Sequence, residues 1–204
     1  MFVGDTILET WKKSLQELVN AKEIVPTERG DETYEILNTT LQISNPLKNR
    51  DELVIFDKKR GIDYYSDHYI NYWTAFRAKT KTFPHSKIKQ QDRVIDKLSG
   101  NEFNRHGYIS IWSPTDDLLT TNYPSCIIGL YLLIRNEKLN MTAILRSNDA
   151  WGQALNDIYE ITAVQIEIAN KLQIDVGTYT HFAMSYHLYS KDHQDAVRLL
   201  QEEK

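Results

Sequence analysis

Residues 126–147, CIIGLYLLIRNEKLNMTAILRS, contain two apolar runs that decide the fold. The runs cover residues 126–136 and 139–147, and a short polar break separates them. Apolar runs of this length suit buried strands, and a short break allows the second strand to fold back on the first. We therefore predict a β-hairpin in the middle of the chain.

On both sides of this hairpin the sequence predicts helices and strands in mixed order. Apolar residues at helical spacing predict the helices, and alternating patterns predict the strands. The predicted helices cover residues 5–21, 65–78, 87–99, 157–172 and 192–204, and the predicted strands cover residues 39–43, 107–112 and 176–189. Because no strict βα repeat, linker or internal repeat is present, we predict one α+β domain spanning residues 1–204.

The length of 204 residues corresponds to roughly one to two domains, and the composition is that of an ordinary globular protein. Its net charge of -4 argues against a protein that coats nucleic acid or binds a membrane through a basic arm. No apolar run reaches the roughly 18 residues that span a bilayer, and the first residues do not form a signal peptide. We therefore expect a soluble, cytoplasmic protein with no nucleic-acid or membrane partner.

The only cysteine, Cys126, begins the first strand of the predicted hairpin. One cysteine excludes an intramolecular disulfide and a Cys-rich zinc site, and we expect no metal. A lone cysteine is most often a small buried hydrophobe. The alternative is a thiolate nucleophile whose pKa is lowered by Arg146 on the neighbouring strand. Residue spacing alone leaves both interpretations open.

Two further motifs carry groups that suit a phosphorylated sugar. RSND at 146–149 combines a guanidinium, a hydroxyl and backbone donors, which suit a phosphate, although a solvated turn with an Arg–Asp pair is equally consistent. His187 and Tyr189 lie two residues apart on a predicted strand, so both rings lie on one face. They suit sugar hydroxyls, or else form part of the core.

Taken in order, the motifs resemble the thymidylate synthase superfamily. The series is PSC at 124–126, RSND at 146–149, a helix beginning near Asn156-Asp157, GTY at 177–179 and HLY at 187–189. The resemblance is free of gaps from Cys126 to Tyr189 and looser before it. It implies a three-layer α/β sandwich around a mixed sheet, with homodimers that pair sheet against sheet.

The resemblance also implies a chemistry. A cysteine thiolate adds to C6 of a pyrimidine nucleotide, and C5 then attacks a one-carbon unit carried by 5,10-methylenetetrahydrofolate. Cys126 matches this nucleophile, and Asp149 matches an aspartate that contacts the folate and anchors the active-site network. The positions that match phosphate-binding residues are Arg29, Arg105, Arg146 and Ser147, and those that match sugar-binding residues are His187 and Tyr189. Arg105 would be lent by the partner subunit, and the second lent arginine falls on His106.

One departure from the family pattern concerns the base. Thymidylate synthases place an asparagine where a gap-free count puts Asp157, and the cytidylate hydroxymethylases of the family carry an aspartate there. A carboxyl group accepts from the 4-amino group of cytosine and, when protonated, also donates to N3. We therefore predict hydroxymethylation of CMP or dCMP. A deletion near Trp151 would instead place Asn156 at the site, as a short thymidylate synthase acting on dUMP requires.

A second departure concerns the catalytic glutamate and the folate. The glutamate precedes a tryptophan by three residues in the family, and here Trp73 is present but Ile70 occupies that position. Asp67 and His68 are the candidate substitutes. By comparison with the family pattern, we expect the C-terminal segment that closes over folate to be missing and the loop before residues 87–99 to be shortened. These losses leave open a nucleotide-binding protein, or an enzyme with altered chemistry, that kept the phosphate and sugar contacts.

Overall fold

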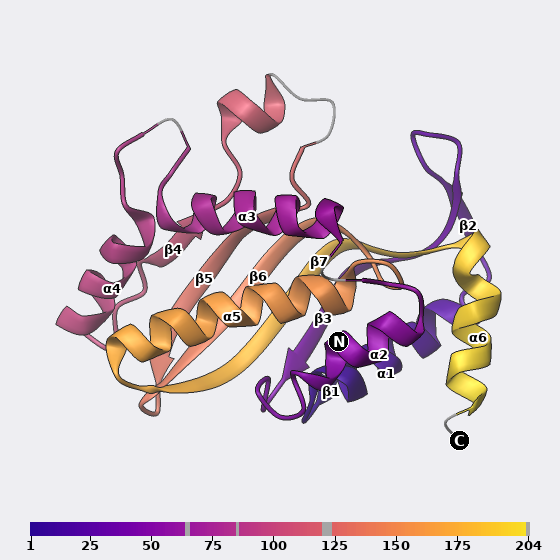
Figure 1. Ribbon diagram of the computed structural model, residues 1–204, viewed down its shortest axis with the longest axis horizontal. Coiled ribbons are helices and arrows are strands. Elements are labelled where there is room, and N and C mark those ends of the chain that lie inside the picture. The colour runs from indigo at the N-terminus through magenta and orange to yellow at the C-terminus, as the bar shows by residue number, and fades with distance from the viewer. Residues whose placement is uncertain (64–65, 85, 120–123, 203–204) are drawn as a thin grey trace.

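A mixed seven-stranded sheet forms the centre of the computed structural model, which describes residues 1–63, 66–84, 86–119 and 124–202. The strand order is β1-β3-β7-β6-β5-β4, and β2 pairs with the first residues of β3 (Figure 1). The strands are β1 Phe2–Gly4, β2 Ile24–Pro26, β3 Glu32–Ile43, β4 Gly107–Ser110, β5 Ile127–Arg135, β6 Lys138–Asp149 and β7 Asp175–Tyr189. With its flanking helices, this sheet confirms the predicted α+β class.

The predicted hairpin is formed by β5 and β6, which pair antiparallel from Arg135↔Lys138 onward. Its two loop residues, Asn136 and Glu137, have φ values of 52° and 59°. Two consecutive left-handed residues give the tight turn whose twist matches that of the flanking strands. β6 then pairs parallel with β7, and the helix between them makes the crossover that a parallel pair requires.

The helices lie over one face of the sheet. They are α1 Ile7–Asn20, α2 Glu52–Lys59, α3 Asp67–Lys81, α4 Gln90–Gly100, α5 Ala154–Leu172 and α6 His193–Glu202, with the short turns η1 Pro114–Leu118 and η2 Ser190–Asp192. α1 and α5 pack directly on the strands, α4 packs on β4, and α2 and α3 contact α5. Figure 1 shows α3 and α5 running in front of the sheet.

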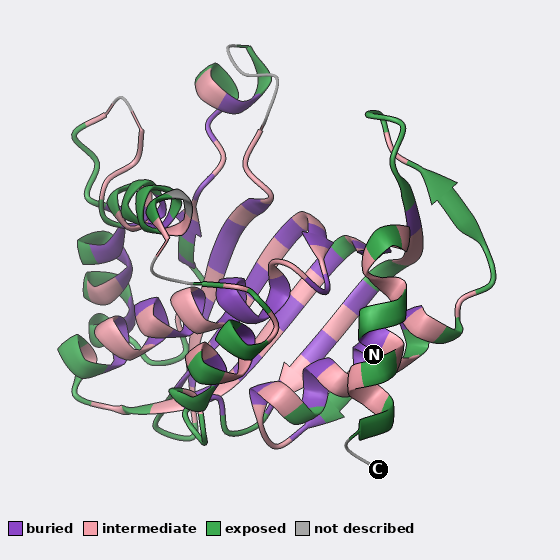
Figure 2. Cartoon of the chain, turned by 45° about the vertical axis from the view of Figure 1, so that its right-hand side comes forward, coloured by how far each residue is buried: buried purple, intermediate pink, exposed green. Residues whose placement is uncertain are grey.

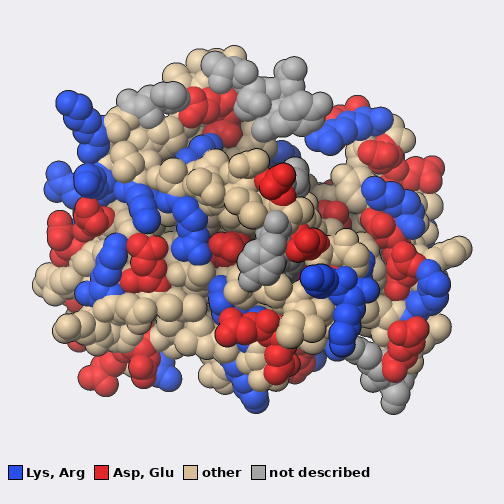
Figure 3. Space-filling model, in the orientation of Figure 1, with Lys and Arg blue, Asp and Glu red and all other residues tan. Residues whose placement is uncertain are grey.

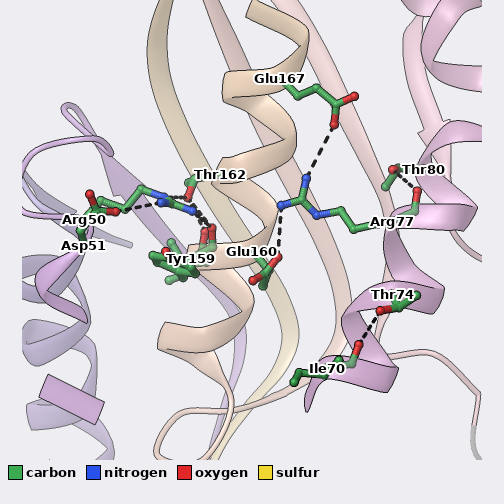
Figure 4. Close-up of polar contacts among 11 residues, drawn as sticks. Arg50, Asp51, Ile70, Thr74, Arg77, Thr80, Tyr159, Glu160, Thr162 and Glu167 are labelled. Carbon is green, nitrogen blue, oxygen red and sulfur yellow. Dashed lines mark hydrogen bonds and ion pairs between the residues drawn. The ribbon is translucent and has the colours of Figure 1, made fainter. Parts of the chain in front are cut away.

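Polar contacts attach the outer segments to α5. Arg77 on α3 reaches Glu160 at 3.1 Å and Glu167 at 3.8 Å (Figure 4). Arg50, just before α2, stacks on the Tyr159 ring with its guanidinium carbon 3.7 Å from the ring centroid. α3 is thereby held beside the strand ends, where its tyrosines matter below.

Besides the short segments η1 and η2, three elements were not predicted, namely α2, β1 and β2. Only Leu53 and Asp57 of α2 are buried, so its sequence carries little helical periodicity. β1 and β2 span three residues each, and such short segments have no measurable alternation. β3 is also longer than the predicted strand at 39–43, because its outer half pairs with β2 and β7.

One face of the sheet is buried under the helices and the other remains partly open. Figure 2 shows buried and intermediate residues alternating along the strands. The intermediate face carries apolar side chains on three central strands, among them Tyr131, Leu133, Ile144 and Phe182. No described helix covers this face.

The alternation of buried and less buried residues along the strands reverses at one end of the sheet. On β7 the buried positions change phase between Ala183 and Tyr186, and on β6 they change between Leu145 and Asn148. On β3 the residues that pack on the core are Tyr34 and Ile36 before Asn38 and Leu41 and Ile43 after it, and Asn38 has a left-handed φ of 55°. An extra residue in the alternation re-aims the side chains that follow it. The polar residues beyond the reversal therefore point to a common region at this end of the sheet.

Candidate active site

A cavity of about 540 Å³ lies at this end of the sheet, a volume that suits a small ligand. Most of the predicted site residues line it, namely Arg29, Cys126, Arg146, Ser147, Asp149, Asp157, His187 and Tyr189. Asp67, Arg105 and Asn156 do not line it. Basic and acidic side chains are intermingled over the face drawn in Figure 3. The arginines that line the cavity are Arg29 and Arg146.

Cys126 and Arg146 lie side by side at the start of β5 and the end of β6. Arg146 Nη2 is 3.7 Å from Cys126 Sγ, and the Arg146 backbone N–H donates to the Cys126 carbonyl at 2.9 Å. The guanidinium also donates to the carbonyls of Pro124, at 2.7 Å, and Ser125, at 3.2 Å. Arg146 is thus fixed against the segment that presents the thiol.

The Cys126 thiol responds to two opposing influences. Burial raises its pKa, and the charges of Arg146 and Arg29 act against that rise, while Asp157 and Asp149 add to it. The predicted lowering by Arg146 is therefore present but is outweighed by burial. The resting side chain is a thiol, and the arginines stabilise the thiolate once a proton leaves.

The segment before Cys126 is held by a buried aspartate that the sequence did not reveal. Asp117, on η1, accepts from the backbone N–H groups of Ser113 and Ser125, both at 2.8 Å. The Trp112 indole donates to the Ser125 carbonyl at 2.7 Å. These contacts fix the backbone directly adjacent to the thiol.

Arg29 reaches the cavity from the β2–β3 hairpin. Thr27, Gly30 and Asp31 close its turn, because Gly30 N–H donates to the Thr27 carbonyl and Thr27 N–H donates to that of Asp31. Gly30 has a φ of 85°, which a residue with a side chain rarely adopts. Arg29 itself is exposed and pairs with Glu28 at 3.6 Å.

The sugar-binding candidates form a polar wall on β7. The His187 and Tyr189 rings pack edge to face with centroids 5.2 Å apart. Burial lowers the pKa of His187, against the charges of Asp149 and Glu35. Glu35 on β3, a cavity residue that no motif indicated, accepts from the Ser185 hydroxyl.

Asp157 lies in the cavity wall, whereas Asn156 points away from it. Asp157 is 4% exposed, and its Oδ2 accepts from Asn148 Nδ2 at 2.6 Å. Burial raises its pKa to about 8, against the Asn148 hydrogen bond and together with the nearby Asp149 charge. Asn156 is fully buried, and its amide atoms have no hydrogen-bond partner in the part of the chain that the structure describes.

The helix α3 supplies tyrosines, and no carboxylate, to the described wall of the cavity. Tyr69 and Tyr72 line it, whereas Asp67 and Ile70 do not. Asp67 is exposed, and Ile70 is 47% exposed. Burial raises the pKa of Tyr69 to about 12. The side chain of His68 lies outside the described structure.

The two remaining candidates have contrasting positions. Asp149 closes the end of β6 and accepts from the Trp151 backbone N–H at 3.0 Å. Arg105 is exposed and lies just before β4, which is an edge strand of the sheet. Its carbonyl accepts from the Tyr131 hydroxyl at 2.7 Å. Among the described residues, no group of acidic, cysteine and histidine side chains has the arrangement of a metal site. Nor does any described helix have the length and apolarity to cross a membrane.

Comparisons with known proteins converge on one family. The family model described as thymidylate synthase matches residues 9–204. A protein of Methanocaldococcus jannaschii named "Putative thymidylate synthase" is 28% identical over 195 residues, covering 90% of this chain and 88% of its own length. A protein of Methanococcoides burtonii with the same name is 24% identical, covering 92% and 88%.

A bacterial relative is matched over a shorter stretch. The thymidylate synthase of Lactococcus lactis is 26% identical over 154 residues, which cover 73% of this chain and 54% of its own length. The family match extends over nearly the whole chain and includes every predicted residue that lines the cavity.

Proposed function

This chain belongs to the thymidylate synthase family, and on that premise we propose that it hydroxymethylates CMP or dCMP at C5. The reaction begins when the Cys126 thiolate adds to C6 of the base. This addition makes C5 nucleophilic, so C5 forms a bond to a one-carbon unit at the oxidation level of formaldehyde and loses its proton. Water then adds to the exocyclic methylene group, and the Cys126 thiolate leaves C6. Cys126 lies in the cavity wall beside Arg146, an arrangement that suits a nucleophile whose charge develops during the reaction.

The position of Asp157 supports cytosine as the base. It lines the cavity, whereas Asn156 is buried in the core. With a pKa of about 8, its carboxyl group is mainly protonated at neutral pH, so one oxygen donates and the other accepts. Cytosine offers a matching pair, because N3 accepts and the 4-amino group donates.

The other cavity residues suit the rest of a nucleoside monophosphate. Arg146, Arg29 and the Ser147 hydroxyl provide donors for the phosphate, and arginine matches a phosphate in both charge and shape. The imidazole nitrogens of His187 and the hydroxyl of Tyr189 suit hydrogen bonds to sugar hydroxyls. Nothing in these contacts favours ribose over deoxyribose.

The donor set also fits a folate. Asp149 offers a carboxyl group for the N–H groups of a pterin, and Tyr69 and Tyr72 line the same cavity with aromatic rings. When bound there, 5,10-methylenetetrahydrofolate would supply a one-carbon unit at the oxidation level of formaldehyde. These residues would hold and orient it next to the base.

A second candidate function is thymidylate synthesis from dUMP. The names of the relatives in Methanocaldococcus jannaschii and Lactococcus lactis favour it. A protonated Asp157 also offers one donor and one acceptor to uracil, although in the opposite order along the base edge. The choice between the two bases therefore depends on which oxygen carries the proton.

Exchange of the C5 proton tests the proposal without presuming a folate. The protein is incubated in heavy water with CMP, dCMP, UMP or dUMP, and the C5 proton signal is followed by NMR. We expect the signal of a cytidylate to disappear with the native protein and to persist with Cys126→Ser.

The other outcomes assign other functions. Exchange with uridylates alone would identify a thymidylate synthase. Exchange that survives Cys126→Ser would contradict the nucleophile. Binding of a nucleotide without any exchange would indicate a binding protein, consistent with the lack of a described carboxylate on the α3 wall.

A further inference from the structure

A chain of hydrogen bonds runs from Asp157 through the core to β7. Asn148 Nδ2 lies 2.6 Å from Asp157 Oδ2, and His181 Nε2 lies 2.9 Å from Asn148 Oδ1. The Tyr179 hydroxyl lies 3.0 Å from His181 Nδ1. All four side chains are at most 4% exposed, so the direction of each bond depends on its neighbours.

The Tyr179 hydroxyl sets the direction of this chain. His181 Nδ1 is its only hydrogen-bond partner in the part of the protein that the structure describes, and a buried O–H donates to such a partner. Burial lowers the pKa of His181 to about 3, so its ring is neutral and carries one hydrogen. With Nδ1 accepting, that hydrogen is on Nε2.

The direction then passes through Asn148 to Asp157. His181 Nε2–H donates to Asn148 Oδ1, so the amide nitrogen faces Asp157 and donates to Oδ2. The reverse direction would leave the Tyr179 hydroxyl hydrogen buried without an acceptor, which costs the full desolvation of that group. Asp157 Oδ1 has no hydrogen-bond partner among the described residues.

We propose that the Tyr179–His181–Asn148 chain selects the base by fixing the acid proton of Asp157 on Oδ1. Oδ2 already accepts from Asn148, and the carbonyl oxygen of an acid is a better acceptor than its hydroxyl. The carboxyl group therefore presents a donor at Oδ1 and an acceptor at Oδ2. This inference rests on the proposed function, in which Asp157 reads the base.

Such a fixed order distinguishes the two pyrimidines. Cytosine is bound when Oδ1–H faces N3 and Oδ2 faces the 4-amino group. Uracil in the same orientation would place N3–H against Oδ1–H and O4 against the lone pairs of Oδ2. A carboxyl group whose proton moved freely would accept either base, so Tyr179, His181 and Asn148 are positioning residues for selectivity.

The direction of the chain is measurable in the protein without nucleotide. Nitrogen-15 NMR of the histidine rings reports which nitrogen carries the hydrogen, and the spectrum of His181→Phe assigns the His181 signals. We expect the Nε2–H tautomer. The Nδ1–H tautomer would overturn the inference, whatever the enzyme does with cytidylates.

Selectivity is measured as the ratio of the UMP to the CMP dissociation constant by calorimetry. In Tyr179→Phe, we expect this ratio to fall about threefold to tenfold, because one hydrogen bond no longer holds the direction. In Asn148→Ala, we expect a fall of at least about tenfold, since Oδ2 loses its donor. The matched control is Tyr186→Phe, which removes another buried hydroxyl of β7 that bonds to Ser14 at 2.9 Å.

Each outcome of the binding experiment has one consequence. A ratio of dissociation constants that is unchanged in both Tyr179→Phe and Asn148→Ala would overturn the inference. An equal fall of the ratio in Tyr186→Phe would also overturn it, because it would indicate general loosening of the core. A native protein that prefers UMP would overturn the proposed function. The tautomer of His181 would still decide the direction of the chain.

Discussion

Asp157 titrates in surroundings that solvate a negative charge poorly. It is 4% exposed and accepts from Asn148, and the charge of Asp149 lies nearby on β6. Because burial favours the neutral acid, the folded protein holds this proton over a pH range in which an exposed aspartate has already lost it.

The affinity for CMP should depend on this proton. We expect the affinity for CMP to be nearly constant around pH 7 and to fall about tenfold for each pH unit above 8, because ionised Asp157 cannot donate to N3. Titration calorimetry in the Cys126→Ser background measures this without interference from the thiol. Affinity that stays level from pH 7 to well above pH 8 would contradict the role of the acid.

Asp157 makes the folded protein less stable as pH rises, whereas an ordinary ion-paired carboxylate makes it more stable. Its folded pKa is raised, so the stability that it contributes is fully present below its unfolded pKa near 3.8 and is lost as pH rises toward 8. We expect Asp157→Asn to flatten the decrease in the free energy of unfolding between these values. The decrease is on the order of a few kcal/mol and is measured by urea denaturation.

Among the elements, η1 and the strand that follows it form one unit around Asp117. Its carboxylate accepts two backbone N–H groups, and Lys79 on α3 lies 3.8 Å away. A buried carboxylate with two backbone donors and a nearby cation is well compensated. It fixes Ser125, and Ser125 precedes the thiol.

Asp117→Asn should loosen the presentation of Cys126. The amide keeps one acceptor oxygen, so one backbone donor loses its partner, at a cost of about 1–3 kcal/mol in stability. We expect C5 exchange to slow by about tenfold. Thermal unfolding and the NMR assay measure both effects. The exposed Asp96→Asn on α4 is the control, and an equal effect there would argue against the bracing role.

For the whole molecule, we propose that a second copy covers the open face of the sheet. Apolar side chains on β5, β6 and β7 lie on this face and are only partly buried. Tyr131, also on this face, bonds to the Arg105 carbonyl. A dimer formed here would carry Arg105 toward the cavity of its partner, as the family resemblance implies.

Mixing two inactive variants tests this shared site. The Cys126→Ser chain keeps Arg105, and the Arg105→Ala chain keeps the Cys126 thiol. We expect mixed dimers to regain exchange activity, because one of their two sites combines Cys126 from one copy with Arg105 from the other. Recovery should disappear when both chains also carry Ile144→Asp, which places a charge on the open face. Failure of the mixture to recover, with dimers confirmed by ultracentrifugation, would contradict the lent arginine.

The local patterns of the sequence determined the hairpin at 126–147, the helix that includes residues 157–172, and the spacing that joins Cys126, Arg146 and His187 in one family pattern. These depend on short-range periodicity and turn chemistry, which a single chain displays directly. Only the tertiary structure decided that Asp157 faces the cavity while Asn156 is buried, and that Asn148, His181 and Tyr179 connect behind it. Those contacts join residues up to 33 positions apart and form only when the parallel strands β6 and β7 are in register under α5. Burial, which no local pattern measures, then raises the pKa of both Asp157 and Cys126.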